Sequence, residues 1–443
     1  MIRKQHGFTL VELMITLVVF TFALSAAIRV FVPIVGKFKQ QSKIAETNVE
    51  GLVGLELLKT DLEHAGYGLP WCFPNNSITY AETTAAPASA LNDATGAGDY
   101  PPRALAAVDN ITFNGNVNGN ANITSIATGS DYLTIKSALV SGTDAAQKWT
   151  YLVAQNAPTP RIWGPPAGTL GTSDPSATDY VIVINPVPSQ ACPANCLVMN
   201  GGTTFGTLNQ GYTQYNAGFP GAFTPSASLS PLQTYLIYDI APGPGTAGTT
   251  LTGPLNMPFN RADYFVGIPA TLPSRCASGT GVLYKAILGQ NTMAFSPSYT
   301  TPLLDCVADM RVIFGLDTNG DGIIDTYSNA DGRHVDDATP ITGQGLQRTA
   351  SYVQSILTSQ SNLSQYRSSV VEVRIYILAH EGQQDQGFDF RLSGPGNPVN
   401  MGSLWTGETN IARPFDLTTL GDLNWMHYRW KVYTIVVKLQ NVQ

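Results

Sequence analysis

An acidic run in the last third of the chain has the residue types and the spacing of a calcium-binding loop. The run FGLDTNGDGIIDTYS spans residues 314–328 and fits the pattern D-x-N-x-D-G-x-x-D. In such a pattern alternate oxygen atoms converge on a hard cation, and a glycine at the sixth position permits a sharp turn. We therefore expect calcium as a cofactor. Its ligands would be side-chain oxygens and one main-chain carbonyl, from Asp317, Asn319, Asp321, Ile323 and Asp325.

The twelfth position of this run departs from a helix–loop–helix calcium site. Ser328 stands where a bidentate glutamate is expected, so the last ligand would come from another residue, for example Asp331. The preceding stretch, residues 307–314, resembles a strand, which predicts a turn between two strands. The alternative is a solvated turn in which the Asp and Asn side chains bond only to the backbone.

The five cysteines form a second group with possible chemistry. They are Cys72, Cys192, Cys196, Cys276 and Cys306. In an exported chain they are expected to form disulfides, and we expect a small Cys192–Cys196 loop and a Cys276–Cys306 pair, which leaves Cys72. Half a zinc site is the alternative for the first pair, but no two histidines have the spacing of zinc ligands. Spacing alone leaves the connectivity open.

Composition and missing motifs exclude several classes of function. Charged residues make up 12% of the 443 residues, and the net charge is -7. The chain has no clustered Lys and Arg that could neutralise phosphates, so we expect no nucleic-acid partner. It also lacks a G-x-S-x-G elbow, an H-E-x-x-H pair and a P-loop, so we expect no enzymatic activity. Abundant Gly, Pro, Asn, Ser and Thr indicate a loop-rich β protein outside the cytoplasm.

The elements that position these residues begin with an apolar helix. Residues 8–28 are a largely apolar run of 21 residues, which as a helix covers roughly 30 Å, the thickness of the hydrocarbon core. A polar leader with Arg3 and Lys4 precedes it, and no cleavage site follows it. We expect a single-pass anchor with the leader in the cytoplasm and the rest of the chain across the membrane.

One residue of this run is acidic. Glu12 would cost on the order of 2–3 kcal/mol inside the bilayer, so it needs a partner or a functional reason. The segment Gly7-Phe8-Thr9-Leu10-Val11-Glu12, between a basic leader and an apolar helix, resembles the processing site of type IV prepilins and pseudopilins. The alternative is an ordinary anchor with a tolerated glutamate.

The resemblance implies three roles at the N-terminus. Prepilin peptidase would cleave between Gly7 and Phe8, removing residues 1–7 as a leader, and the new terminus at Phe8 would be methylated. Glu12 would neutralise the terminal amine of a neighbouring subunit as the subunit enters a filament. Opposite charges stabilise each other in a medium of low dielectric constant, where either charge alone is penalised.

The helical pattern continues beyond the membrane, which predicts one pilin helix over residues 8–69. Its buried face is expected to hold Ile44, Val49, Leu52, Leu55, Leu58, Leu62 and Ala65, with charged residues such as Asp61 between them. Pro33 and Gly36 predict a kink or a locally melted turn at the junction of the two halves. Residues 57–68, which end in Ala-Gly-Tyr-Gly, resemble the end of this helix in PilW-type minor pilins, as residues 428–434 resemble their closing strand.

The remaining sequence predicts a β-rich head over residues 70–443. Its portion over residues 75–300 is rich in loops, and residues 301–443 are expected to form a pilin-like sheet that carries the calcium-type turn. Strands are predicted at residues 131–139, 180–185, 234–240, 307–314, 370–378 and 430–439. The fold class is therefore α+β, with the long helix packed on a large antiparallel head.

These features favour a structural minor pilin of a type IV pilus that helps to prime or cap assembly at the tip. The resemblance implies other minor and major pilins, prepilin peptidase and an inner-membrane assembly platform as partners. It also implies a bacterial inner-membrane location before assembly and the pilus at the cell surface afterwards. Two alternatives stay open. The head is an adhesin displayed at the tip, or the chain is a large pseudopilin of a type II secretion system.

Overall fold

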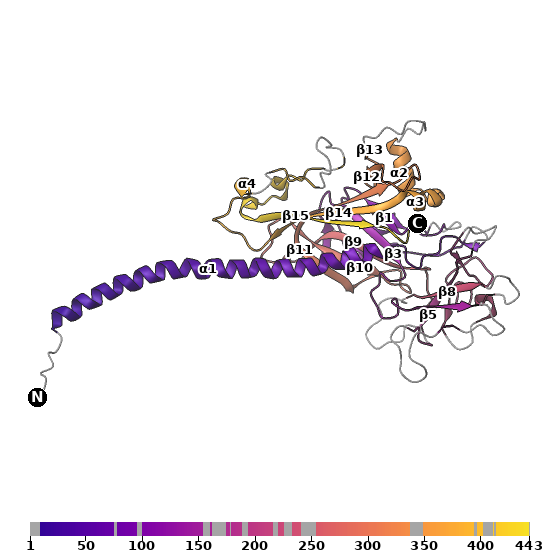
Figure 1. The fold of residues 1–443 in the computed structure, drawn as a ribbon, viewed down its shortest axis with the longest axis horizontal. Helices are drawn as coiled ribbons and strands as arrows, with labels where there is room; N and C mark the ends of the chain where they lie inside the picture. The colour runs from indigo at the N-terminus through magenta and orange to yellow at the C-terminus, as the bar shows by residue number, and fades with distance from the viewer. Residues whose placement is uncertain are drawn as a thin grey trace, which may run out of the picture.

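The computed structural model describes most of the chain. The described residues are 9–74, 78–94, 100–153, 160–161, 174–177, 179–187, 194–215, 220–225, 233–240, 254–336, 349–393, 397–401, 411 and 413–442. They form one long helix followed by a large β-rich head, which confirms the predicted α+β class (Figure 1).

The described residues form the long helix α1, several short helices and many strands. The helices are α1 (Leu10–Glu63), α2 (Ala350–Thr358), α3 (Leu363–Ser369) and α4 (Phe390–Ser393). The first strands are β1 (Leu105–Val108), β2 (Ile123–Ile126), β3 (Tyr132–Ser137), β4 (Trp149–Val153), β5 (Tyr180–Asn185), β6 (Cys196–Leu197), β7 (Thr213–Gln214) and β8 (Thr234–Asp239). The later strands are β9 (Asn260–Pro269), β10 (Gly281–Leu288), β11 (Phe295–Leu316), β12 (Thr326–Ser328), β13 (His334–Asp336), β14 (Val370–Glu381) and β15 (Arg429–Lys438).

Helix α1 is continuous through Pro33 and Gly36, so the melted turn expected there is absent. Figure 1 shows the helix projecting from the head and curving toward its N-terminal end. Proline removes one backbone hydrogen bond, which bends a long helix without ending it. The helix stops at Glu63 rather than at residue 69, because Gly66 and Gly68 take left-handed φ angles of 86° and 71° in the turn that follows.

The main sheet is antiparallel throughout and carries the helix. Its strands run in the order β1-β3-β9-β10-β11, and β14 and β15 follow on the far side of β11. Helix α1 packs against β11, β14 and β15. The sheet takes β1, β2, β3, β9 and β10 from residues before 300, so it crosses the boundary that the sequence suggests between a loop-rich portion and a sheet.

A second, smaller sheet is inserted between two strands of the main sheet. Its strands β4, β8 and β5 are neighbours, with β6 and β7 pairing to β5. It lies between β3 and β9 in the chain, and these two strands pair directly, from Tyr132 opposite Phe265 to Ser137 opposite Asn260. The chain therefore leaves and re-enters the main sheet at adjacent positions.

Alternating strand residues build an apolar core on each face of the main sheet. On β14, Ile375 and Ile377 belong to the core that also contains Leu58 and Leu62 of α1. The side chain of Leu378 joins a second core on the opposite face, formed with the segment that leads into β15. Both faces of β14 are thus buried, as expected for a central strand of a covered sheet.

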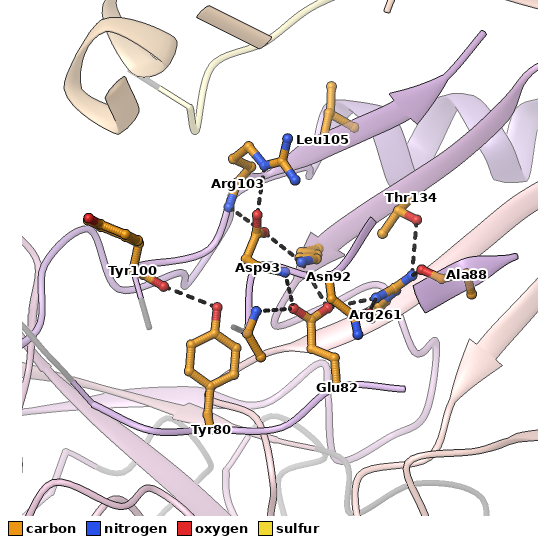
Figure 2. A network of polar contacts seen from close by, with 12 residues as sticks. Tyr80, Glu82, Ala88, Asn92, Asp93, Tyr100, Arg103, Leu105, Thr134 and Arg261 are labelled. Atoms are coloured by element: carbon orange, nitrogen blue, oxygen red, sulfur yellow. Dashed lines mark hydrogen bonds and ion pairs between the residues drawn. The ribbon is translucent and has the colours of Figure 1, made fainter. Parts of the chain in front are cut away.

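Charged side chains are also buried in the head, where they form a balanced network (Figure 2). Its acidic members are Glu82, Asp93 and Asp263, and its basic members are Arg103, Lys136 and Arg261. Figure 2 shows Arg261 of β9 beside Glu82 and Asn92, which come from the segment before β1. Burial alone would raise the pKa of Asp93, but the charges of Arg103 and Lys136 outweigh it and hold this pKa at about 2.

Candidate functional site

The N-terminal end of α1 is closed by a reciprocal cap that includes Glu12. The Thr9 hydroxyl accepts a hydrogen bond from the Glu12 N–H at 3.3 Å, and the Glu12 carboxylate accepts from the Thr9 N–H at 3.0 Å. This capping box satisfies two free donors and places the carboxylate near the positive end of the helix dipole. Gly7 and Phe8, the expected cleavage and methylation residues, lie outside the described residues.

The following part of α1 is almost entirely exposed. Leu10–Phe38 is long and apolar enough to cross a membrane, and the protein itself buries none of its most apolar stretch. An apolar surface of this size is unfavourable in water, so it needs an apolar environment outside the head. Lipid or other apolar helices can supply that environment.

The second half of α1 approaches β11 closely, because two glycines face it. A methyl group added at Gly54 would lie 2.1 Å from the carbonyl oxygen of Leu303, and one added at Gly51 would lie 2.7 Å from the Leu304 side chain. Beyond these glycines Leu58 and Leu62 are fully buried. Glycine therefore brings the helix backbone onto the strand, and leucines fill the space farther along.

The predicted buried face of this half is only partly correct. Leu55, Leu58, Leu62 and Ala65 are buried, whereas Val49 and Leu52 are 62% and 58% exposed. The side chain of Ile44 is outside the described part of the helix. The prediction failed near Val49 because the head covers only the last turns of α1. The apolar side chains at Val49 and Leu52 are therefore not part of the core of the head.

Asp61 was expected among the exposed charges of the helix, and the structure buries it. The Lys285 ammonium on β10 lies 2.5 Å from the Asp61 carboxylate, and the Tyr264 hydroxyl on β9 donates to the same oxygen. Burial raises the pKa of Asp61, although the charge of Lys285 opposes this effect. The spacing of Asp61 with Leu58 and Leu62 on one helical face was the available signal. These contacts join the last turn of α1 to the main sheet.

The acidic turn connects two antiparallel strands, as predicted. Leu316 at the end of β11 pairs with Thr326 at the start of β12. Between them the Asp317 carboxylate accepts hydrogen bonds from the backbone N–H groups of Asn319 at 3.2 Å, Gly320 at 2.6 Å and Gly322 at 2.7 Å. These bonds fold the turn around one carboxylate, and the left-handed φ angles of Gly320 and Gly322 permit it.

The other expected calcium ligands lie around the same turn, but they do not all converge. Asn319 and Asp321 are connected by hydrogen bonds, and the Ile323 side chain is 68% exposed. The Asp325 carboxylate instead accepts from the N–H and hydroxyl of Thr318. In the part of the chain that the structure describes, no three Asp, Glu, His or Cys side chains come together as a metal site.

Ser328, at the twelfth position of the run, supplies no ligand. It is buried in β12, where its hydroxyl donates to the carbonyl oxygens of Asn329 and Arg333. Asp331 lies in the next turn, and burial raises the pKa of its carboxyl group. Neither residue completes the calcium site in this arrangement.

One of the two predicted disulfides is confirmed and the other is wrong. Cys276 and Cys306 are bonded, which ties the segment before β10 to β11. Cys196 is a free thiol, and Cys72, which was expected to be left over, is disulfide-bonded. In the backbone, Cys72 and Cys196 are neighbours in an isolated β-bridge, and the Leu197 N–H donates to the Cys72 carbonyl oxygen. Cys192 lies outside the described residues.

Comparisons with known proteins agree with the geometry of both ends of the chain. Residues 2–28 match the prokaryotic N-terminal methylation motif, and residues 274–441 match the family described as Type IV Pilus-assembly protein W. The second match contains the acidic turn and the strands β10, β11, β14 and β15. Residues 29–273 lie outside both matches. No curated protein and no solved structure matches the chain.

Proposed function

We propose that this chain, which the two family matches identify as a PilW-type prepilin-like protein, is a minor pilin that helps to prime or cap type IV pilus assembly at the tip. The methylation motif and the PilW match make it a pilin related to type IV pili. Its position at the tip and its role in priming are our proposal. The family description of residues 274–441 favours a pilus over a secretion system.

The observation that carries the proposal is the division of α1 into two halves. The head buries Leu58 and Leu62 against the PilW-type sheet, while Leu10–Phe38 projects from the head and its most apolar stretch is not buried by the protein. A helix divided in this way can stay in the bilayer before assembly and pack among other helices afterwards. The exposed side chains of Val49, Leu52 and Val53 extend the apolar surface toward the head, where a neighbouring pilin helix would cover them.

Glu12 has the central role in the proposed assembly step. Prepilin peptidase removes residues 1–7, and the methylated amine of Phe8 then carries a positive charge. The Glu12 carboxylate of one subunit would pair with that amine of its neighbour, which removes the cost of both charges in an apolar bundle. The basic leader places the N-terminus in the cytoplasm and the head outside the inner membrane. The assembly platform and the other pilins would contact the helix within the inner membrane.

Two measurements test this function. Mass spectrometry of the mature chain should find methylated Phe8 at the N-terminus, and a retained Met1 would remove the processing step. Glu12→Gln should keep processing and membrane insertion but abolish recovery of the protein in sheared pili. Glu56→Gln is the matched control, because Glu56 is an exposed glutamate of the same helix outside the membrane span. Normal recovery of the Glu12→Gln variant in pili would contradict the role of Glu12.

A second experiment addresses priming. A strain that lacks this chain should lose most surface pili and regain them when the parent gene is restored. Unchanged pilus numbers in the deletion strain would contradict the priming role, because the chain would then not be needed to start a filament.

We also propose that the acidic turn binds calcium through Asp317, Asn319, Asp321, the carbonyl of Ile323, and Asp325. The turn already folds around the Asp317 carboxylate, and three aspartates in nine residues provide the negative charge that Ca²⁺ prefers. Calorimetric titration of the full chain in detergent should show calcium binding in the parent and in the control Asp144→Ala. Asp321→Ala should show none, and the absence of heat in the parent would contradict the proposal.

A further inference from the structure

A small cavity lies where three parts of the chain meet. It has a volume of about 200 Å³ and is lined by the turn after α1, by β5 and β8 of the second sheet, and by the residues that follow β15. Figure 1 shows the second sheet beyond the end of α1 that is farthest from the N-terminus. The cavity therefore lies near the end of α1 that is farthest from the membrane span.

Three aromatic residues are among those that line it. They are Tyr67, Trp71 and Tyr238. The rings of Tyr67 and Tyr238 meet edge to face with centroids 5.4 Å apart. Gly68 fixes the turn against them, since a methyl group there would lie 3.1 Å from the Tyr238 ring. The Arg367 guanidinium stacks on Trp71 at 5.3 Å and donates to its carbonyl oxygen, so this ring is also held in place.

The polar groups of the cavity are neutral amides and hydroxyls. Asn195, Gln440 and Asn441 contribute side-chain amides, and none of the lining residues carries a charge. Asn441 donates to the carbonyl oxygen of Glu63 at the end of α1. Among the described residues, the amides of Asn195 and Gln440 and the polar atoms of the three aromatic side chains have no hydrogen-bond partner. Donors and acceptors are thus available to a ligand.

We propose that this cavity binds one sugar ring of a neutral saccharide. A pyranose presents an apolar C–H face, which suits a rigid aromatic wall, and a rim of hydroxyl groups, which suits side-chain amides that both donate and accept. A phosphate or carboxylate would find no cation in the lining, and a metal ion would find no carboxylate. The volume is below the range of about 300–1,000 Å³ typical of sites for drug-sized ligands, which limits the ligand to about one ring.

This inference is independent of the proposed role in pilus assembly. It uses no residue of the membrane span and none of the acidic turn. A failure of sugar binding would not change the expected results of the processing and piliation experiments. Normal piliation, in turn, would not contradict sugar binding in the cavity.

Saturation-transfer NMR on the full chain in detergent provides the test. The probes are the methyl glycosides of glucose, galactose, mannose, N-acetylglucosamine and N-acetylgalactosamine, with glucuronate and N-acetylneuraminate as charged comparisons. At least one neutral glycoside should give a saturable signal. Gln440→Ala should weaken its binding by about fivefold, as expected for one lost hydrogen bond, because Gln440 is exposed and its loss leaves the fold intact. Trp71→Ala should abolish the signal.

The control is Gln354→Ala, which removes an exposed amide of α2 outside the cavity lining and should leave binding unchanged. Three results would overturn the proposal. They are no saturable signal from any neutral glycoside with the parent, an unchanged affinity in both Gln440→Ala and Trp71→Ala, and tighter binding of the charged sugars than of the neutral ones.

Discussion

The ammonium of Lys285 on β10 lies 2.5 Å from the carboxylate of Asp61 on α1, and both side chains are nearly buried. This pair connects the helix that would enter a filament with the strand at the centre of the head. The head and the helix are therefore joined by an ion pair as well as by leucines. A force applied along α1 would act directly on the main sheet.

Breaking this pair should weaken the head markedly. Asp61→Ala or Lys285→Ala alone should lower the free energy of unfolding by about 3–5 kcal/mol, because each change leaves one buried charge unpaired. The double variant Asp61→Ala, Lys285→Ala should lose much less than the sum of the two single losses. Denaturant unfolding of the four proteins measures the coupling, and strictly additive losses would show that the charges do not stabilise each other.

The close approach of α1 to β11 predicts opposite outcomes for two glycine substitutions in one helix. Gly54→Ala should lower the free energy of unfolding by about 1–3 kcal/mol despite the better helix propensity of alanine, because its methyl group would overlap the Leu303 carbonyl. Gly36→Ala has no atom within 4 Å of the new methyl group and should cause no loss. Thermal unfolding of the parent and both variants measures these changes. Equal stability of the two variants would mean that α1 lies farther from β11 than the structure shows.

The cysteine arrangement predicts which thiol reacts. Alkylation of the unreduced, denatured protein should modify Cys196 and leave Cys72, Cys276 and Cys306 unmodified, and label on Cys72 would contradict the arrangement. Replacing Cys276 and Cys306 by serine should lower the free energy of unfolding by about 3–4 kcal/mol, because the disulfide closes a loop with a sequence separation of 30. Cys196→Ser is the matched control and should change stability by less than about 1 kcal/mol.

A buried carboxyl group in the second sheet predicts a pH effect. Burial, with the nearby charge of Asp179, raises the pKa of Asp239 to about 9. The folded protein therefore holds a proton that the unfolded chain releases above pH 4. The contribution of Asp239 to stability is fully present below pH 4 and is lost as the pH rises toward 9, with a slope of up to about 1.4 kcal/mol per pH unit.

Asp239→Asn removes this titration. Chemical unfolding between pH 5 and 9 should show the parent losing stability relative to the variant, and parallel curves would contradict the buried acid. Lys148 pairs with the neighbouring Asp179 at 2.8 Å, and both side chains are mostly buried. Because salt screens buried charges weakly, the pH dependence of stability should change only slightly with ionic strength.

The sequence predicted strands best where one rule applied to the whole segment. The short β-like run at residues 180–185 and the alternation in residues 370–378 are β5 and most of β14. The central strand β9 was missed because its first half reads Asn-Arg-Ala-Asp, which is unusual in a buried strand. Arg261 and Asp263 are fully buried there, and their partner Glu82 lies far away in the chain. No local pattern reveals such a long-range compensation.

In the candidate site, too, local features were predicted and contacts between distant residues were not. The acidic turn was predicted between strands, because the spacing of its aspartates is a local property. Asp61 was expected at the surface, since charge alone suggests exposure and its partner Lys285 is distant in sequence. The disulfide state of Cys72 was missed in the same way, because the spacing of cysteines along the chain does not encode their connectivity.

The direct pairing of Ser137 with Asn260 has a consequence for how this head can change over time. A segment whose ends meet at neighbouring strand positions can be enlarged, replaced or lost while the strands around it keep their register. The whole second sheet is such a segment, and it supplies Tyr238 and Asn195 to the distal cavity. Related chains could therefore exchange what they recognise by exchanging this insert, while the sheet that docks α1 stays the same.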